Sequence, residues 1–136
     1  MVYKFKVPCS KSKLVEIREF LQQVLSENAI PDVTVNALVL AVDEVCANLI
    51  IHSHNCNPDE NIELKVKLDG KSEITFDIID HGVGFNISDY EEPLISDIIK
   101  QKRKGGIGLM LVKRIMDEIE FIKGEKKNVY RLHKKI

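Results

Sequence analysis

Hydrophobic and polar side chains alternate with two different periods along the chain, and the changes of period predict its strands and helices. Residues 2–8 alternate apolar and polar positions, which is typical of a half-buried strand. Residues 10–28 repeat apolar side chains at helical spacing, and residues 31–54 form a long, mostly apolar helical run. The first part of the chain is therefore expected to be one strand followed by two helices.

The remainder of the chain predicts two hairpins separated by a third helix. Residues 61–80 alternate with period two on either side of an Asp-Gly pair, which is a strong turn signal. Residues 106–119 return to helical spacing, and residues 120–135 resemble a second hairpin. No repeat, low-complexity tract or linker interrupts this order. Residues 1–136 are therefore expected to form a single α/β domain with its helices on one face of a sheet.

Composition narrows the class of protein. The chain has 136 residues, of which 44% are hydrophobic and 30% charged, as in a soluble globular domain. No apolar stretch reaches the roughly 20 residues of a membrane helix, and no N-terminal segment resembles a signal peptide. The three cysteines are an odd number at unrelated spacings, which disfavours a disulfide framework. A cytoplasmic protein without a membrane partner is expected.

Charge is distributed unevenly along the chain. Residues 100–136 contain 12 basic and four acidic side chains, a net charge of +8, whereas residues 1–99 contain 8 basic and 17 acidic ones, a net charge of −9. A basic C-terminal region indicates either an anionic partner or a solvated basic face. Direct binding of nucleic acid is not favoured, because the basic residues lack interleaved aromatic side chains and a DNA-reading helix.

Three short motifs carry the candidate chemistry. Glu44 and Asn48 lie one turn apart on the second helix, which is otherwise almost free of charge. The segment DHGVGF, residues 80–85, follows a predicted strand, and KGGIGL, residues 104–109, begins a predicted helix. Each motif alone has a simpler explanation: two solvated helix residues, a hairpin turn and a helix start. Together they form one coherent set.

The set suits a nucleotide. The Asp80 carboxylate can accept a hydrogen bond from the exocyclic amine of a base, and glycine N–H groups at a helix start can hold phosphate oxygens. The carboxamide oxygen of Asn48 is a hard ligand suited to Mg²⁺, and Glu44 can act as a general base one turn away. The two familiar glycine-rich nucleotide motifs, the P-loop and the dinucleotide fingerprint, are absent.

The order of these motifs resembles that of the GHKL ATPase superfamily, which contains gyrase B, MutL and histidine kinase catalytic domains. AVDEVCANLIIH looks like its N box, DHGVGF like its G1 box and KGGIGLMLV like its G2 box. The resemblance extends over nearly the whole chain and is closest to the small bacterial anti-sigma factor serine kinases. It implies the histidine kinase-like (Bergerat) ATPase fold, a two-layer α/β sandwich with a mixed sheet covered by helices on one side.

The resemblance also assigns roles. Asn48 would bind Mg²⁺, Glu44 would activate the attacking hydroxyl, and Asp80 would bind the adenine amine. Residues 86–104 would form a lid over ATP. The glycines would shape the adenine pocket and the phosphate loop, and a basic residue before the loop could reach the phosphates; these residues are Gly82, Gly84, Lys104, Gly105, Gly106 and Gly108.

The function implied is that of an ATP-binding anti-sigma factor. Such a protein phosphorylates a serine of a STAS-type anti-anti-sigma protein and sequesters a sigma factor, and members of the group often dimerise. Two alternatives stay open at this point: a nucleotide-gated binding module of the same fold with little or no kinase activity, and a stand-alone ATPase. His52, His54 and Cys56 also invite a zinc site, but their spacing at a helix end suits one ion poorly.

Overall fold

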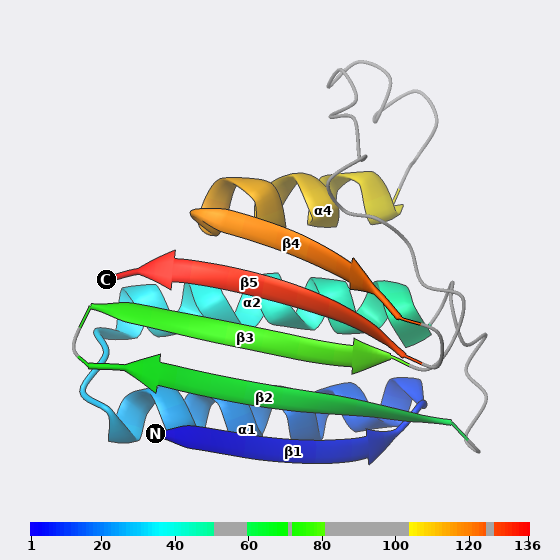
Figure 1. Ribbon diagram of the computed structural model, residues 1–136, viewed down its shortest axis with the longest axis horizontal. Coiled ribbons are helices and arrows are strands. Elements are labelled where there is room, and N and C mark those ends of the chain that lie inside the picture. Colours follow the sequence, from blue (N-terminus) through cyan, green and yellow to red (C-terminus); the bar gives the residue numbers. More distant parts are fainter. Residues whose placement is uncertain (51–59, 71, 81–103, 125–126) are drawn as a thin grey trace.

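The computed structural model describes residues 1–50, 60–70, 72–80, 104–124 and 127–136. Five strands form one sheet in the order β1-β2-β3-β5-β4, and the helices cover one of its faces (Figure 1). The predicted two-layer α/β architecture is therefore confirmed. None of the described helices has the length and apolar character that crossing a membrane would require.

Every pair of neighbouring strands is antiparallel. The resemblance implied a mixed sheet, whereas the described strands pair only in antiparallel fashion. The reason is topological: β3 and β4 run in the same direction, but β5 returns between them and pairs with both (Figure 1). The strands are β1 (Val2–Pro8), β2 (Asn61–Asp69), β3 (Glu73–Asp80), β4 (Glu118–Lys123) and β5 (Asn128–Lys135).

The helical layer contains α1 (Leu14–Glu27), α2 (Asp32–Asn48) and α4 (Lys104–Ile115), and a short 3₁₀ turn, η1 (Lys11–Lys13), precedes α1. Helix α2 lies between α1 and α4 and contacts both.

The third helix ends earlier than the sequence predicted. The backbone N–H of Asp117 donates to the carbonyl of His133 at 2.9 Å, so the chain has left the helix and joined β5 at that point. Ile119 consequently lies in β4 rather than on the helix.

Strand alternation decides which side chains meet the helices. On β3, Ile74, Phe76 and Ile78 point to the helical layer and are fully buried, whereas Thr75 and Asp77 face the other side and are only partly buried. The same alternation on β5 buries Tyr130 and Leu132.

One face of α2 packs into the core and carries the buried side chains Val35, Leu38, Val39, Val42 and Cys46, and Leu49, directly after the helix, is buried as well.

The two chain ends lie at the same end of the sandwich, on either side of the β2–β3 hairpin (Figure 1). The N–H of Leu68 donates to the carbonyl of Met1 at 3.0 Å, and the N–H of Ile136 donates to the carbonyl of Ser72 at 2.9 Å. The turn itself uses Gly70 at φ 64°, a left-handed conformation that favours glycine. The predicted Asp-Gly hairpin is therefore confirmed.

Candidate functional site

The C-terminal ends of α2 and β3 and the N-terminal end of α4 lie at one end of the sandwich, opposite the chain termini (Figure 1). These three ends carry Asn48, Asp80 and Lys104, respectively. The fold thus places at one end of the sandwich three positions, 48, 80 and 104, that are 32 and 24 residues apart in the sequence. This end of the molecule is the candidate site.

Asp80 is the last residue of β3 and is fully buried. It occupies the inward position that Ile74, Phe76 and Ile78 occupy earlier on the strand, so the alternation places a carboxylate where an apolar side chain is expected. Burying a carboxylate is costly unless it is hydrogen-bonded. A carboxylate kept in such a position is well suited to accept hydrogen bonds from a bound ligand.

Asn128, a residue that the sequence analysis did not single out, is the register partner of Asp80 across β3 and β5. It is only 3% exposed. The only signal in the sequence was a polar residue at the beginning of a predicted strand, which is common at strand ends. Its position beside Asp80 becomes evident only from the strand register.

Asn48 ends α2 and is 8% exposed. Its Nδ2 donates to the backbone carbonyl of Glu44 at 2.7 Å. This bond commits the amide nitrogen to the helix, and the Oδ1 lies on the other branch of the carboxamide. That oxygen is the atom a metal ion would use.

Glu44 is half-buried one turn before Asn48. Burial raises the pKa of its carboxyl above the ordinary value of 4.5, and the neighbouring charge of Asp43 raises this pKa further. A carboxylate with a raised pKa is a stronger base than an exposed one. The local environment of Glu44 is therefore compatible with general-base chemistry.

Asp43 on α2 forms an ion pair with Arg18 on α1. It was not predicted as a site residue. Its Oδ2 lies 3.6 Å from Nη1 of Arg18, and its Oδ1 is buried without a hydrogen-bond partner in the described part of the chain. Burial raises the pKa of Asp43, and the Arg18 charge partly opposes the shift. The Arg18–Asp43 pair thus sets part of the field around Glu44.

The glycine motif lies in the first turns of α4, as predicted: the helix begins at Lys104 and includes Gly105, Gly106 and Gly108. The first N–H groups of a helix have no partner within it, and the helix dipole favours an anion there. Gly82 and Gly84 lie outside the described residues, as do His52, His54 and Cys56 and all of the predicted lid except Lys104.

The three buried polar side chains of the described residues are Asn48, Asp80 and Asn128. All three lie at this end of the sandwich (Figure 1). Buried polar groups are normally retained for hydrogen bonding or for function.

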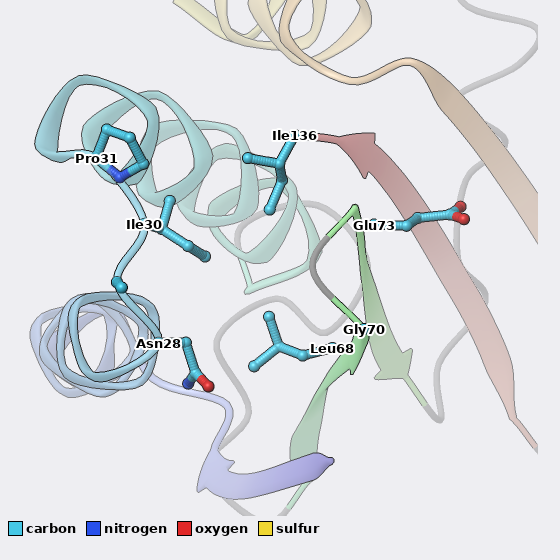
Figure 2. Close-up of a pocket in the computed structure, with 8 residues that line it drawn as sticks. Asn28, Ile30, Pro31, Leu68, Gly70, Glu73 and Ile136 are labelled. Carbon is cyan, nitrogen blue, oxygen red and sulfur yellow. The ribbon is translucent and has the colours of Figure 1, made fainter.

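A separate cavity of about 350 Å³ lies at the other end, beside the chain termini (Figure 2). It contains none of the predicted site residues. Its lining is formed by Asn28, Ala29, Ile30, Pro31, Leu68, Gly70, Glu73 and Ile136. The predicted site residues that the structure describes therefore lie at the Asp80 end and not beside this cavity.

Comparison with known proteins gives a consistent picture. A family described as the histidine kinase-like ATPase domain matches residues 7–134. The serine-protein kinase RsbW of Bacillus subtilis (strain 168) is 29% identical over 122 residues, which cover 85% of this chain and 74% of that protein. An anti-sigma F factor of Bacillus cytotoxicus is 33% identical over 85 residues, which cover 62% of this chain and only 57% of that relative's length.

Solved structures share the fold. The RsbU and RsbW domains of Rv1364c from Mycobacterium tuberculosis align with a TM-score of 0.70 at 15% identity, covering 98% of this chain and 32% of that one. The SiaB–SiaC complex of Pseudomonas aeruginosa gives a TM-score of 0.64 at 15% identity, covering 98% of this chain and 89% of that one. At this identity the likeness concerns the fold alone.

Proposed function

The chain belongs to the family of histidine kinase-like ATPase domains, and from that membership we propose that it is an ATP-dependent protein serine/threonine kinase of the anti-sigma type. The observation that carries the proposal is the gathering of Asn48, Asp80 and Asn128 at one end of the sandwich, because they are the buried polar residues of the part of the chain that the structure describes. The names of the relatives, serine-protein kinase and anti-sigma F factor, support the same class of activity.

In this proposal different residues bind the adenine of ATP, its phosphates and the Mg²⁺ ion. Asp80 accepts a hydrogen bond from the adenine amine, and the N–H groups at the start of α4 hold phosphate oxygens. Asn48 is a suitable ligand for Mg²⁺ because its Nδ2 is already bonded to the helix and its Oδ1 is the hard oxygen that this ion prefers. The ion would supply charge neutralisation at the phosphates.

Glu44 removes the proton from the serine hydroxyl that attacks the γ-phosphate. Because it lies one helical turn before Asn48, it is near the metal ligand without being required to bind the metal. The acceptor would be a serine of a STAS-type partner protein, and the ATP-bound protein would bind a sigma factor. A homodimer and a cytoplasmic location belong to the same proposal.

The test is Glu44→Ala, followed by ATP calorimetry and by phosphoserine formation on a STAS protein encoded beside the gene. Loss of a general base should leave ATP affinity unchanged and lower the transfer rate by roughly 10²–10⁴-fold. The matched control is Glu19→Ala, an exposed carboxylate on α1, which should transfer at the wild-type rate. Transfer at the wild-type rate by Glu44→Ala would exclude the proposed base.

The wild type also separates the alternatives. Binding of a sigma factor without any phosphotransfer would favour the nucleotide-gated binding module. ATP hydrolysis without either partner would favour the stand-alone ATPase.

The pH dependence follows from the raised pKa of Glu44. A base works only when ionised, so the transfer rate should fall as pH decreases through a pKa above 4.5. The folded state binds this proton more tightly than the unfolded chain does, so the contribution of Glu44 to stability is lost as pH rises through the same pKa. Glu44→Gln should therefore remove the acid limb of the rate profile and should not destabilise the fold at neutral pH.

A further inference from the structure

A second cluster of chemically active side chains lies on the sheet face that carries no helices, near the end occupied by the chain termini. Glu118 and Glu120 are two residues apart on β4 and therefore point to the same face. His133 is the register partner of Glu118 on β5, so its imidazole joins them. Nothing in the proposed kinase reaction uses these three residues.

The donor atoms of the cluster are close enough to share an ion. One ligand atom from each of Glu118, Glu120 and His133 lies within 4.8 Å of the others, and His133 Nε2 is 3.9 Å from Glu120 Oε2. Metal–ligand bonds of about 2.0–2.2 Å require donor atoms about 3–3.5 Å apart. The Glu120 side chain is 43% exposed, so it can rotate to close the remaining distance.

The contacts of His133 place Nδ1 against Thr75 and Glu73, and Nε2 is the ring nitrogen that faces Glu120. Its Nδ1 lies 3.1 Å from Thr75 Oγ1 and 3.4 Å from Glu73 Oε1, and the side chain is only 18% exposed. Figure 2 shows the Glu73 carboxylate pointing away from the cavity residues Ile30 and Leu68. When Nδ1 carries the ring proton, Nε2 has the free lone pair, and Nε2 lies 3.9 Å from Glu120 Oε2. This is the carboxylate–histidine arrangement that orients metal-binding imidazoles.

The nearest basic side chain on β5 has another principal partner. Arg131 donates through Nε to Asp77 Oδ1 at 2.8 Å and through Nη2 to Asp77 Oδ2 at 3.2 Å. Its Nη1 lies 3.8 Å from Glu120, a longer and weaker contact. A doubly charged ion can compete with that contact for Glu120 without breaking the Arg131–Asp77 pair.

We propose that Glu118, Glu120 and His133 bind a divalent transition-metal ion, with Zn²⁺ as the best match. Zinc accepts imidazole nitrogen and carboxylate oxygen together, and water can complete the coordination of three protein ligands. Glu73 and Thr75 act from behind by fixing the tautomer of His133. The site is separate from the nucleotide end, so it binds Zn²⁺ with or without Mg²⁺ and ATP.

The experiment is calorimetric titration of ZnCl₂ into the full chain, with and without Mg²⁺·ATP. The wild type should bind one ion at this site in both conditions. His133→Gln and Glu118→Gln should each weaken binding at least about 10-fold, since even loss of an outer contact costs that much. Glu118 is exposed, so its substitution tests the site without threatening the fold. The matched control is Glu63→Gln on β2, where the wild-type carboxylate lies 3.9 Å from Lys6 Nζ.

Two results would contradict the proposed zinc site. The proposal is overturned if the wild type binds no Zn²⁺, because His133 would then be only a member of an ion-pair cluster. It is also overturned if His133→Gln and Glu118→Gln bind Zn²⁺ as the wild type does. In that case a triple substitution of His52, His54 and Cys56 would show whether the other candidate ligands hold the ion.

Discussion

The same strands form the open face and the helix-covered face of the sheet. A polar side chain is nevertheless stronger evidence for a functional site on the covered face than on the open one. On the open face Asp77 pairs with Arg131 and Glu63 with Lys6, and all four side chains keep 21% to 60% of their surface exposed. Water would solvate these groups even without their partners. Their presence therefore says little about function.

On the helix-covered face, by contrast, polar side chains are rare among the described residues. Its strand residues are apolar along most of their length, and the described exceptions that are buried, Asp80 and Asn128, pair at one end. A polar group in this position costs stability unless it is bonded. The comparison teaches that a single buried carboxylate on the inner face is already evidence for a site, whereas carboxylates on the open face, such as Glu118 and Glu120, need a further ligand such as His133 beside them.

The largest expected effect is a loss of stability when an apolar side chain of the inner face is removed. Phe76 is fully buried on β3, so Phe76→Ala should lower the free energy of unfolding by about 3–5 kcal/mol. Urea denaturation measures this loss. The control is Lys67→Ala, an exposed position on the outer face of β2, which should change stability by less than about 0.5 kcal/mol. Equal losses would show that the two faces do not differ in packing.

The next effect concerns ligand binding rather than folding. Asp80→Asn should weaken ATP binding by about 1.5–3 kcal/mol, the range for a hydrogen bond to a charged group. Asp77→Asn is the matched control, because Asp77 is on the same strand but faces outward. It should bind ATP as the wild type does in calorimetry. GTP should compete poorly with ATP, because guanine has an oxygen in place of the adenine amine.

A smaller effect is expected at Asn48. Asn48→Ala should reduce the Mg²⁺ enhancement of ATP affinity by about tenfold or less, since Mg²⁺ keeps waters and phosphate oxygens among its ligands. ATP titrations with Mg²⁺ and with EDTA measure this enhancement. An enhancement equal to that of the wild type would remove Asn48 from the metal site.

The smallest effect should come from the open face. Arg131→Met removes a bidentate pair with Asp77 that is partly exposed to water, so the free energy of unfolding should fall by about 0.5–1 kcal/mol. The loss should shrink at high salt because the charges are screened. Denaturation at low and high ionic strength checks both statements. A loss as large as that of Phe76→Ala would contradict the distinction between the faces.

Local patterns were sufficient to predict most elements. The alternation in residues 2–8 and 61–80 and the helical spacing in residues 10–28 are set by neighbours along the chain, and the structure has strands and helices there. The placement of Asp80 at a strand end followed from the same alternation. The motif spacing also predicted that the glycines of residues 105–108 begin a helix.

Features set by distant parts of the chain could not be predicted in this way. The insertion of β5 between β3 and β4 depends on pairing across many residues, and so does the Asp80–Asn128 register. Ile119 was predicted in the third helix but lies in β4, and this difference depends on the backbone hydrogen bond from Asp117 to His133. The contact between Glu118 and His133 likewise arises only when the last hairpin closes.

The position of the two chain ends, both bonded to the β2–β3 hairpin, decides where a label or a surface linker can be attached. Met1 and Ile136 are both hydrogen-bonded beside the β2–β3 turn, across the length of the sandwich from Asp80 (Figure 1). A fluorescent reporter or a surface linker attached at either end would therefore project away from the candidate ATP site. Immobilised protein could be exposed to nucleotide and to partner proteins with that end facing the solution.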